Sequence, residues 1–378
     1  MPSLVPDLAR ERGLYVHIPF CVQKCAYCDF YSLPHQLDRL DSYLEAVALE
    51  ACQYAGLKFQ TLYVGGGTPS LLQAAGLNQL LGSLGPIFDL SSVTEATLEA
   101  NPESITPDWL QAALSRGVNR ISIGVQSLSD SELERVGRVH TASQAMRAIE
   151  MTQKHGFRNV SADAILGLPG QDWTSLLITL ETLIGMGLPH ISLYCLSIEP
   201  HTPLAIHPPP GIPSDDEQAE LYENSLGLLH QRGYLHYEIS NFALPGYECR
   251  HNLNYWRGGE YLGLGPAAAS HFQGKRFKNK SDLEAYLQDP CRQIEEIEDL
   301  PQSKKAGEEA ILRLRLLEEG LNITEMIERL GDENLVGLMW RLDQLVKEGF
   351  LTRSGAIYRL KPEWALVSNS ILARVLED

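Results

Sequence analysis

The sequence predicts an α/β protein built on a partial (β/α)6 barrel, followed by a C-terminal α+β region. Three observations predict it. Short apolar, β-rich runs alternate with amphipathic helical stretches, six such runs occur, and polar residues follow several of them. The alternation favours a parallel sheet with helices outside it, and right-handed crossovers curl such a sheet. Six units rather than eight favour a partial barrel, and a doubly wound open sheet is the alternative.

The six predicted strands lie in the first two hundred residues. They are residues 13–19, 61–67, 95–101, 120–126, 159–166 and 190–196. Polar or glycine residues occupy the C-terminal ends of four of them: Gly65, Gly66, Gly67, Thr68, Glu99, Asn101, Gln126, Ser127 and Asp163. In α/β barrels and open sheets this edge carries the active site, whereas a single such residue is ordinarily a turn or a cap.

Two helices between the strands carry terminal signals. Residues 38–56 and 141–156 have the pattern of amphipathic helices, and each stretch ends near a glycine, as at a C-cap. We expect Asp38 to cap the first helix and Thr141 the second, because short polar side chains satisfy free backbone N–H groups.

A proline-rich segment, residues 207–213, predicts an extended loop near a domain boundary. We therefore predict a barrel domain over 1–212 and a second domain over 213–378. Residues 303–362 follow a helix–helix–helix–hairpin pattern that resembles a winged helix. Winged helices bind DNA or serve only as packing modules, and the acidic balance of the chain favours the second role.

Composition narrows the class of protein. The 378 residues carry a net charge of −17, so the basic footprint of a nucleic-acid-binding protein is missing. No apolar run has the length of a membrane span, and residues 1–13 lack the pattern of a signal peptide. These features predict a cytoplasmic protein that does not bind nucleic acid.

Three cysteines, Cys21, Cys25 and Cys28, fall within the stretch FCVQKCAYCDF. A structural zinc site needs a fourth ligand from elsewhere in the chain, and a disulfide is disfavoured in the cytoplasm. Three thiolates in one loop are suited to three irons of a [4Fe–4S] cluster, which leaves the fourth iron open to a small molecule. The other cysteines, at 52, 195, 249 and 291, are expected to be buried apolar residues.

CxxxCxxC after the first strand and GGGTP after the second resemble the radical S-adenosylmethionine (SAM) superfamily. The resemblance implies that the amino and carboxylate groups of SAM chelate the open iron. It also implies that the reduced cluster gives SAM one electron and releases a 5′-deoxyadenosyl radical. The glycines after the second strand are expected to lie along the methionine moiety.

Further motifs resemble the coproporphyrinogen-dehydrogenase-like branch of that superfamily: YVHIPFC, YVGGGTPS, LEANPES, IGVQS and DAILGLPGQ. The matching positions imply SAM contacts at Tyr15, Gly66, Gly67, Thr68, Glu99, Gln126, Arg138 and Asp163. Glu99 is suited to accept from the SAM ammonium, Asp163 from ribose hydroxyls, and Arg138 is suited to donate to a carboxylate.

Two departures point to one family within this branch. The dehydrogenase has another cysteine two positions after the third cluster ligand, where this sequence has Phe30, and it has a longer N-terminal extension. Both features resemble the HemW family of haem chaperones. The stretch CRHNLNYW contains HNxxYW, a motif associated with haem in that family, which implies haem contacts at His251, Asn252, Tyr255 and Trp256. Cys249 is a competing thiolate ligand.

The resemblance implies a protein that binds haem and passes it to acceptor haemoproteins such as respiratory-chain cytochromes. It would carry a [4Fe–4S] cluster and SAM and would lack coproporphyrinogen oxidase activity. The alternative is an oxygen-independent coproporphyrinogen III dehydrogenase, which decarboxylates porphyrinogen propionates. Homodimerisation, peripheral membrane association through an acceptor, and SAM cleavage in the normal cycle are left open.

Overall fold

The computed structural model describes residues 11–298 and 300–376, which separate into two compact units. Unit 1 comprises the chain up to Ser161, Ile198–Pro208 and Gly259–Glu298, and unit 2 comprises Ala162–Ser197, Pro209–Gly258 and the C-terminal residues from 300 on. The domain boundary near residue 212 stays a prediction.

Unit 1 is built on parallel strands whose bounds differ from the predicted ones by at most one residue. They are β1 (Arg12–Ile18), β4 (Thr61–Gly66), β5 (Glu95–Ala100) and β6 (Arg120–Gln126). Leu14 pairs with Leu62 and Leu62 with Ala96, so the apolar runs lie side by side. Nearly every residue of β6 is buried, as expected of a parallel strand covered on both faces.

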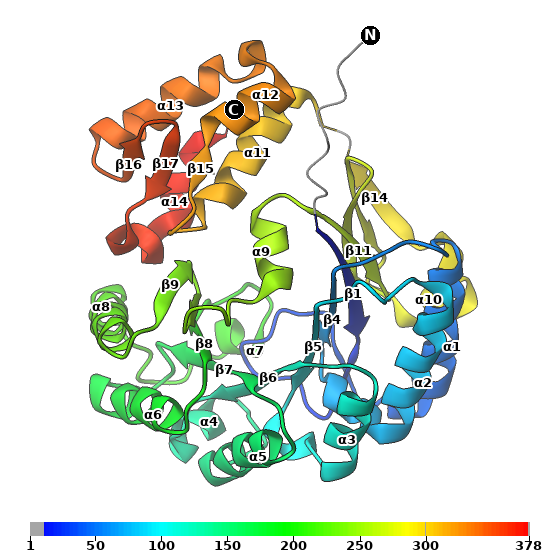
Figure 1. Cartoon of the computed structure of the whole chain (residues 1–378). Helices are drawn as coiled ribbons and strands as arrows, with labels where there is room; N and C mark the ends of the chain where they lie inside the picture. The colour runs from blue at the N-terminus through cyan, green and yellow to red at the C-terminus, as the bar shows by residue number, and fades with distance from the viewer. Residues whose placement is uncertain (1–10, 299, 377–378) are drawn as a thin grey trace. The chain divides into compact units, whose positions relative to one another are not determined.

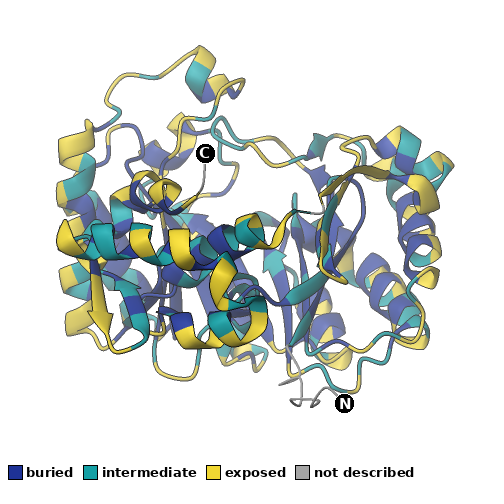
Figure 2. Cartoon of the chain, turned by 90° about the horizontal axis from the view of Figure 1, so that it is seen from above, coloured by how far each residue is buried: buried dark blue, intermediate teal, exposed yellow. Residues whose placement is uncertain are grey.

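Helices connect these strands and cover one face of the sheet (Figure 1). They are α1 (Leu40–Cys52), α2 (Gln73–Ile87), α3 (Pro107–Ser115), α4 (Asp130–Arg135) and α5 (Ala142–Lys154). Figure 2 shows that the helices carry buried residues on one side and exposed residues on the other. This division is the amphipathic pattern that the sequence contains.

Of the two predicted helix caps, one is confirmed and one is wrong. Thr141 caps α5 as predicted, and its hydroxyl accepts from the backbone N–H of Gln144 at 3.3 Å. The prediction for Asp38 was wrong, because α1 begins at Leu40 after a 3₁₀ turn that contains Asp38. The N-cap position of α1 is Arg39, which makes no side-chain capping bond.

Unit 1 also contains strands that the sequence analysis did not single out. Strand β11 (Glu260–Leu264) pairs in parallel with β1, and three antiparallel strands follow it in the sheet. These are β12 (Ala269–Phe272), β13 (Lys275–Asn279) and β14 (Ile294–Glu298). The shorter elements of the unit are β2 (Phe20–Cys21), β3 (Leu33–Pro34), α7 (Pro203–Ile206) and α10 (Leu283–Gln288).

The last two predicted strands belong to unit 2, although β7 begins in unit 1. They are β7 (Asn159–Leu166) and β8 (His190–Cys195), which are continued by the antiparallel β10 (Asn241–Ala243) and β9 (Leu235–Glu238). The helices of this part are α6 (Trp173–Gly185), α8 (Asp215–Gln231) and α9 (Arg250–Trp256). Residues 207–213 form no helix or strand, as predicted.

The C-terminal part of unit 2 has the winged-helix pattern. Three helices are followed by a hairpin, and a short strand before the second helix completes a small sheet in the order β15-β17-β16. The elements are α11 (Gln302–Leu314), β15 (Leu321–Asn322), α12 (Ile323–Leu330), α13 (Val336–Lys347), β16 (Leu351–Ser354), β17 (Ile357–Leu360) and α14 (Ser368–Leu372).

The burial predicted for the scattered cysteines was wrong at three of four positions. Cys249 is fully buried, but Cys52, Cys195 and Cys291 are exposed. Cys52 and Cys195 are the last residues of α1 and β8, where regular structure ends and side chains reach solvent. Within the described residues, none of the helices has the length and hydropathy needed to cross a bilayer.

Candidate functional site

The three clustered cysteines lie in a loop, residues 20–31, that follows β1 and is held at its centre. The backbone N–H of Ala26 donates to Val136 at 3.0 Å, and its carbonyl accepts from Leu204 N–H of α7 at 2.9 Å. Within this cysteine loop the N–H of Cys28 donates to the carbonyl of Cys25 at 3.1 Å. Backbone bonds on both sides therefore fix the segment that presents the thiols.

Two of the sulfur atoms accept side-chain hydrogen bonds from other parts of the sheet edge. The hydroxyl of Thr68, just after β4, donates to Cys21 Sγ at 3.4 Å. The guanidinium of Arg138, after α4, donates to Cys25 Sγ at 3.5 Å. Burial raises the pKa of Cys21 above its ordinary value, and the hydrogen bond from Thr68 offsets this only in part.

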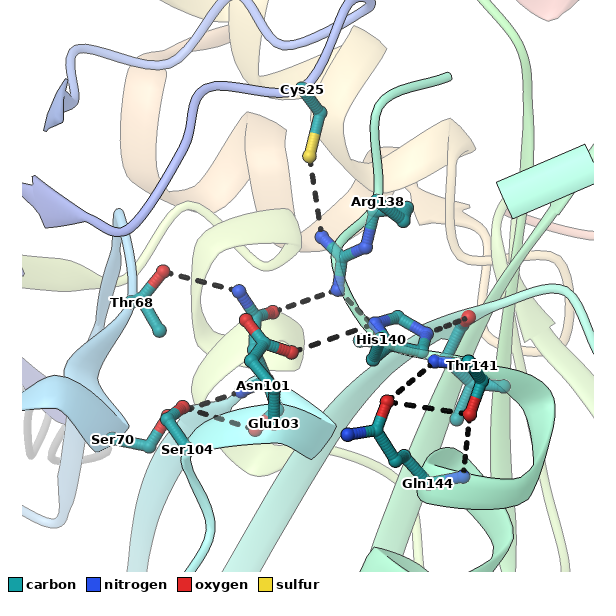
Figure 3. A network of polar contacts seen from close by, with 12 residues as sticks. Cys25, Thr68, Ser70, Asn101, Glu103, Ser104, Arg138, His140, Thr141 and Gln144 are labelled. Atoms are coloured by element: carbon teal, nitrogen blue, oxygen red, sulfur yellow. Dashed lines mark hydrogen bonds and ion pairs between the residues drawn. The ribbon is translucent and has the colours of Figure 1, made fainter. Parts of the chain in front are cut away.

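Arg138 is the cation of this edge, although it lies outside any strand. Its Nη2 donates to the carbonyl of Gly124 at 2.7 Å and to Asn101 Oδ1 at 3.0 Å (Figure 3). Burial works against its charge, but the neighbouring Tyr27 and Cys25 raise the pKa of Arg138 above its ordinary value. Its Nε is buried without a hydrogen-bond partner. The guanidinium is thus a fixed positive charge beside the cysteine loop.

A second group gathers around the carboxylate of Glu99 on β5. Tyr63 Oη donates to Glu99 Oε1 at 2.7 Å, and the N–H of Gly66 donates to Oε2 at 3.1 Å. Burial, and then the charge of Glu99, raise the pKa of Tyr15 far above its usual range, which keeps this phenol protonated. The predicted SAM residues Tyr15, Gly66 and Glu99 therefore lie near one another, with Gly66 and Glu99 at the ends of β4 and β5 and Tyr15 in the middle of β1.

The glycines after β4 are required by the chain's own packing. Gly66 has φ +108°, and a Cβ there would lie 2.7 Å from the ring of His17. A Cβ on Gly67 would lie 2.5 Å from the carbonyl oxygen of Phe20. His17 Nε2 donates to the carbonyl of Tyr31 at 2.8 Å, and its Nδ1 accepts from Tyr15 Oη at 3.0 Å. These glycines let the end of β4 approach the cysteine loop closely.

Gln126 ends β6 in a strained conformation. Its φ of 66° is uncommon for a residue other than glycine, and such strain concentrates at functional sites. The side chains near Gly124 show which residues lie close to Gln126. A Cβ on Gly124 would lie 3.0 Å from Gln126 Nε2, 3.1 Å from Asn101 Oδ1 and 3.3 Å from Arg138 Nη2. The structure therefore brings Gln126, Asn101 and Arg138 to one place.

Asp163 is the one predicted SAM contact outside this group. It lies on β7, in the stretch of that strand assigned to unit 2, and it is half-buried. Its role stays a prediction.

The predicted haem residues occupy one turn-and-a-half of helix, α9, in unit 2. His251 is only 1% exposed, and its Nε2 lies 2.7 Å from Tyr255 Oη. The ring of Trp256 packs against a small core that includes Tyr237 and Leu316, and Arg315 lies over its face at 4.5 Å. Asn252 is half-buried on the same helix, and the neighbouring Cys249 is fully buried. His251 and Tyr255 thus contact each other, while Trp256 faces a different neighbour.

Three residues of unit 1 hold the predicted site residues in place without having been predicted as cofactor contacts. Tyr63 holds Glu99, Asn101 joins Arg138 to Thr68, and His140 lies 3.5 Å from Glu103 beneath them. Burial works against a charge on Glu103, but the contact with His140 and the charge of Arg138 keep its pKa below the ordinary value. Asn101 was identified at the C-terminal end of its strand but was given no role, whereas Tyr63 lies within β4 and carried no such signal.

The side chains of the cysteine loop fit a [4Fe–4S] cluster by their chemistry. Three free thiols lie in one loop, two accept hydrogen bonds, and a buried cation lies beside them. Among the described residues, no three His, Cys, Asp or Glu side chains are gathered as ligands of a single metal ion. A cluster does not need such a group, because each thiolate binds a different iron.

Comparison with known proteins defines the class. Residues 15–183 match the radical SAM superfamily. The solved structure titled "Coproporphyrinogen III oxidase (HemN) from Escherichia coli is a Radical SAM enzyme" superposes with a TM-score of 0.85 at 22% identity. The superposition covers 97% of this chain and 90% of that one. The chain has the radical SAM fold, and the predicted fold class is confirmed.

Relatives over the full length define the family. The heme chaperone HemW of Escherichia coli (strain K12) is 36% identical, over 97% of this chain and 98% of the relative. HemW of Bacillus subtilis (strain 168) is 32% identical over 97% and 100%. HemW of Lactococcus lactis subsp. lactis (strain IL1403) is 37% identical over 82% and 80%. This chain belongs to the HemW family.

Proposed function

We propose that this protein is a haem chaperone, which binds haem and transfers it to acceptor haemoproteins. The observation that carries the proposal is the similarity to proteins named heme chaperones over nearly the whole chain. Phe30 supports it further. This side chain is 68% exposed, at the position where the related dehydrogenases have an additional cysteine. Respiratory-chain cytochromes are the proposed acceptors, and the cytoplasm is the proposed location.

The proposed cofactors are a [4Fe–4S] cluster, SAM and haem. Cys21, Cys25 and Cys28 would hold the cluster, which when bound supplies an open iron for SAM and a single electron. The residues proposed to contact SAM are Tyr15, Gly66, Gly67, Thr68, Glu99, Gln126, Arg138 and Asp163. Those proposed to contact haem are His251, Asn252, Tyr255 and Trp256.

The chain's own residues would act on SAM mainly by charge. Tyr63 and the backbone of Gly66 hold the carboxylate of Glu99, which suits it to accept from an ammonium group. Arg138 is held by Gly124 and Asn101 and carries the complementary positive charge for a carboxylate. An amino acid moiety that bears both groups matches these two charges.

Haem ligation would require His251 to give up a hydrogen bond. Its Nε2 is paired with Tyr255 Oη in this structure, so that nitrogen becomes a metal ligand only after the tyrosine hydroxyl turns away. Exchanging one hydrogen bond costs about 1 kcal/mol, which iron ligation offsets easily. Tyr255 would therefore tune haem affinity as well as flank the macrocycle.

One anaerobic experiment separates the proposal from the dehydrogenase alternative. The reconstituted protein is given SAM, a one-electron reductant and coproporphyrinogen III, and the porphyrins are separated by chromatography. We expect no protoporphyrinogen from protein with a verified iron content. In parallel, haem-loaded protein is mixed with an apo-cytochrome, and haem should move to the acceptor. Clear decarboxylation without haem transfer would assign the dehydrogenase activity instead.

A matched set of variants assigns the cofactors to their residues. Replacing Cys21, Cys25 or Cys28 by Ser should abolish the absorbance of the cluster while circular dichroism stays unchanged. Cys52→Ser is the control, because this thiol is exposed at the end of α1. A full iron load in each of the three variants would contradict the ligand assignment.

A further inference from the structure

A continuous chain of hydrogen bonds joins Cys21 and Cys25 through the sheet edge of unit 1. Figure 3 shows the part of it that runs from Cys25 to Thr68. Asn101 Nδ2 donates to Thr68 Oγ1 at 3.2 Å, and Thr68 donates onward to Cys21 Sγ at 3.4 Å. On the other side, Arg138 donates through Nη2 to Asn101 Oδ1 at 3.0 Å and through Nη1 to Cys25 Sγ at 3.5 Å. Within this chain of bonds, Asn101 links Thr68 and Arg138, the two side chains that donate hydrogen bonds to the sulfur atoms.

The direction of every bond in this chain follows from elementary chemistry. A guanidinium only donates, so the atom of Asn101 that faces Arg138 must be the carbonyl oxygen. The amide nitrogen then faces Thr68 and must donate to it. The hydroxyl oxygen of Thr68 is occupied as an acceptor, which leaves its hydrogen for Cys21. The orientation of the Asn101 amide therefore sets the direction of the hydroxyl.

The backbone holds Asn101 in place independently of these contacts. Its N–H donates to Ser70 Oγ at 3.1 Å, and its carbonyl accepts from Ser104 Oγ at 3.1 Å. The two serine hydroxyls lie 2.6 Å apart. The position of the amide is thus fixed by the chain around it, which is the arrangement expected of a residue that orients others.

We infer that Asn101 is a positioning residue for the [4Fe–4S] cluster, which aims the hydroxyl of Thr68 at Cys21 and the guanidinium of Arg138 at Cys25. The inference rests on the proposed cluster ligands. Hydrogen bonds to thiolate sulfur are among the factors that set the reduction potential of such a cluster. They stabilise the reduced form, which has more negative charge. Asn101 therefore holds the potential higher than the loop alone would give.

The two ends of the chain of bonds depend on Asn101 to different extents. Arg138 has a second anchor in the carbonyl of Gly124, at 2.7 Å, so it stays near Cys25 without the asparagine. The hydroxyl of Thr68 is free to rotate once Asn101 Nδ2 is removed. The bond to Cys21 is therefore the one that loses its direction first.

Asn101→Asp is the sharpest test because it preserves the size of the side chain. A carboxylate still accepts from Arg138, but it cannot donate to Thr68. It accepts the Thr68 hydroxyl hydrogen instead and withdraws it from Cys21. Thr68→Val removes the same sulfur contact with no change at position 101. Asn101→Ala completes the set without adding charge.

Asn119→Asp is the matched control. Asn119 lies just before the N-terminal end of β6, whereas Gln126 and the cysteine loop lie at the C-terminal end. The Asn119 amide also bridges two groups. It accepts from Ala96 N–H and donates to the carbonyl of Thr94, each at 2.9 Å. The control therefore introduces the same charge and breaks the same kinds of bond, away from the cysteines.

The measurements are the iron content, the rate of iron loss to a chelator, and the midpoint potential by electron paramagnetic resonance during a redox titration. Asn101→Asp, Asn101→Ala and Thr68→Val should each shift the potential to more negative values. Iron loss should become about tenfold faster, as is usual when a partner of a metal ligand is removed. Asn119→Asp should match the native protein in both readouts. In Thr68→Val protein, the further change Asn101→Ala should have a smaller effect than in native protein.

The outcomes separate this inference from the proposed function. Native protein that binds no cluster after reconstitution would overturn both. Native protein with a full cluster, together with Asn101 variants of unchanged potential and iron loss, would overturn the role of Asn101 alone. Equal shifts in Asn119→Asp and Asn101→Asp would also overturn it, because the effect would then follow from charge or stability.

Discussion

Glu50, on α1, is a buried carboxyl group far along the chain from the residues it contacts. It accepts from Tyr286 Oη at 2.6 Å, from Asn279 Nδ2 at 2.6 Å and from the N–H of Gly265 at 2.8 Å. Burial raises the pKa of Glu50 to about 7, and the three hydrogen bonds only partly offset it. This single residue makes the stability of unit 1 sensitive to pH near neutrality.

The sign of this sensitivity is set by the raised pKa. In the unfolded chain Glu50 loses its proton near the ordinary value of about 4.5, whereas the folded chain keeps it until about 7. Between these values the folded state binds more protons, so stability falls as pH rises, by about 3 kcal/mol in total. Glu50→Gln should remove this loss when unfolding midpoints are compared at pH 5 and pH 8. Glu45→Gln, an exposed change on the same helix, should leave the loss intact.

Tyr255 provides a second prediction at the scale of one residue. If His251 ligates haem iron, Tyr255→Phe should bind haem about fivefold more tightly, because a hydrogen bond worth about 1 kcal/mol no longer competes for Nε2. His251→Ala should weaken haem binding and leave the iron–sulfur absorbance unchanged. Titration of each variant with haem, followed by the Soret absorbance, measures both. Native affinity in His251→Ala would exclude this histidine as the ligand.

Site residues that belong to a short sequence motif could be predicted from the sequence. The side chains that contact them could not. The cysteine loop and Glu99 follow from short patterns. Tyr63, which holds Glu99, is separated from it by 36 residues, and the contact exists only because β4 and β5 pair in a particular register. The exposure of Cys291 has the same origin, since it depends on how the turn after α10 packs against α1.

At the scale of elements, the strands β1, β4, β5, β6, β7 and β8 were predicted within one residue, because each is a short apolar run between helical stretches. The strands β11–β14 were not predicted from the sequence because they are short and partly polar. Strand β14 is also fully exposed at the edge of the sheet. Asp38 shows a further limit. It has the right residue type for a cap, but a 3₁₀ turn over Leu37–Arg39 moves the N-cap of α1 from Asp38 to Arg39.

Helix α5 offers a test of one predicted element. Thr141 and Gln144 form a reciprocal capping box, with the N–H of Thr141 donating to Gln144 Oε1 at 2.8 Å. Thr141→Ala should lower the free energy of unfolding by about 1 kcal/mol, and Thr141→Ser should restore most of it. Chemical denaturation measures both variants. Iron content should not change, because the cap lies at the surface and leaves Arg138 in place.

At the scale of the whole molecule, charge decides what the winged-helix part can do. Proteins that bind DNA through this fold neutralise phosphates with Lys and Arg. Here the net charge is −17, and the exposed residues of α13 include Val336 at 63% and Trp340 at 65%. On the hairpin, Arg353 is paired with Asp343 at 2.9 Å. Other cations of this part are paired with carboxylates as well, such as Arg329 with Glu309 and Arg374 with Glu348, which leaves fewer of them for phosphates.

We therefore expect no binding to duplex DNA. In a gel-shift experiment with random duplex, about 10 µM protein and about 50 mM salt, conditions that reveal ordinary non-specific binding, no retarded band should form. Val336→Lys combined with Trp340→Lys places two cations on the same exposed face, and any binding gained by this variant should vanish as salt is raised. Retardation of the native protein that weakens steeply with salt would contradict the expectation. In that case the winged-helix part would be interpreted as a nucleic-acid interface and not as a packing module.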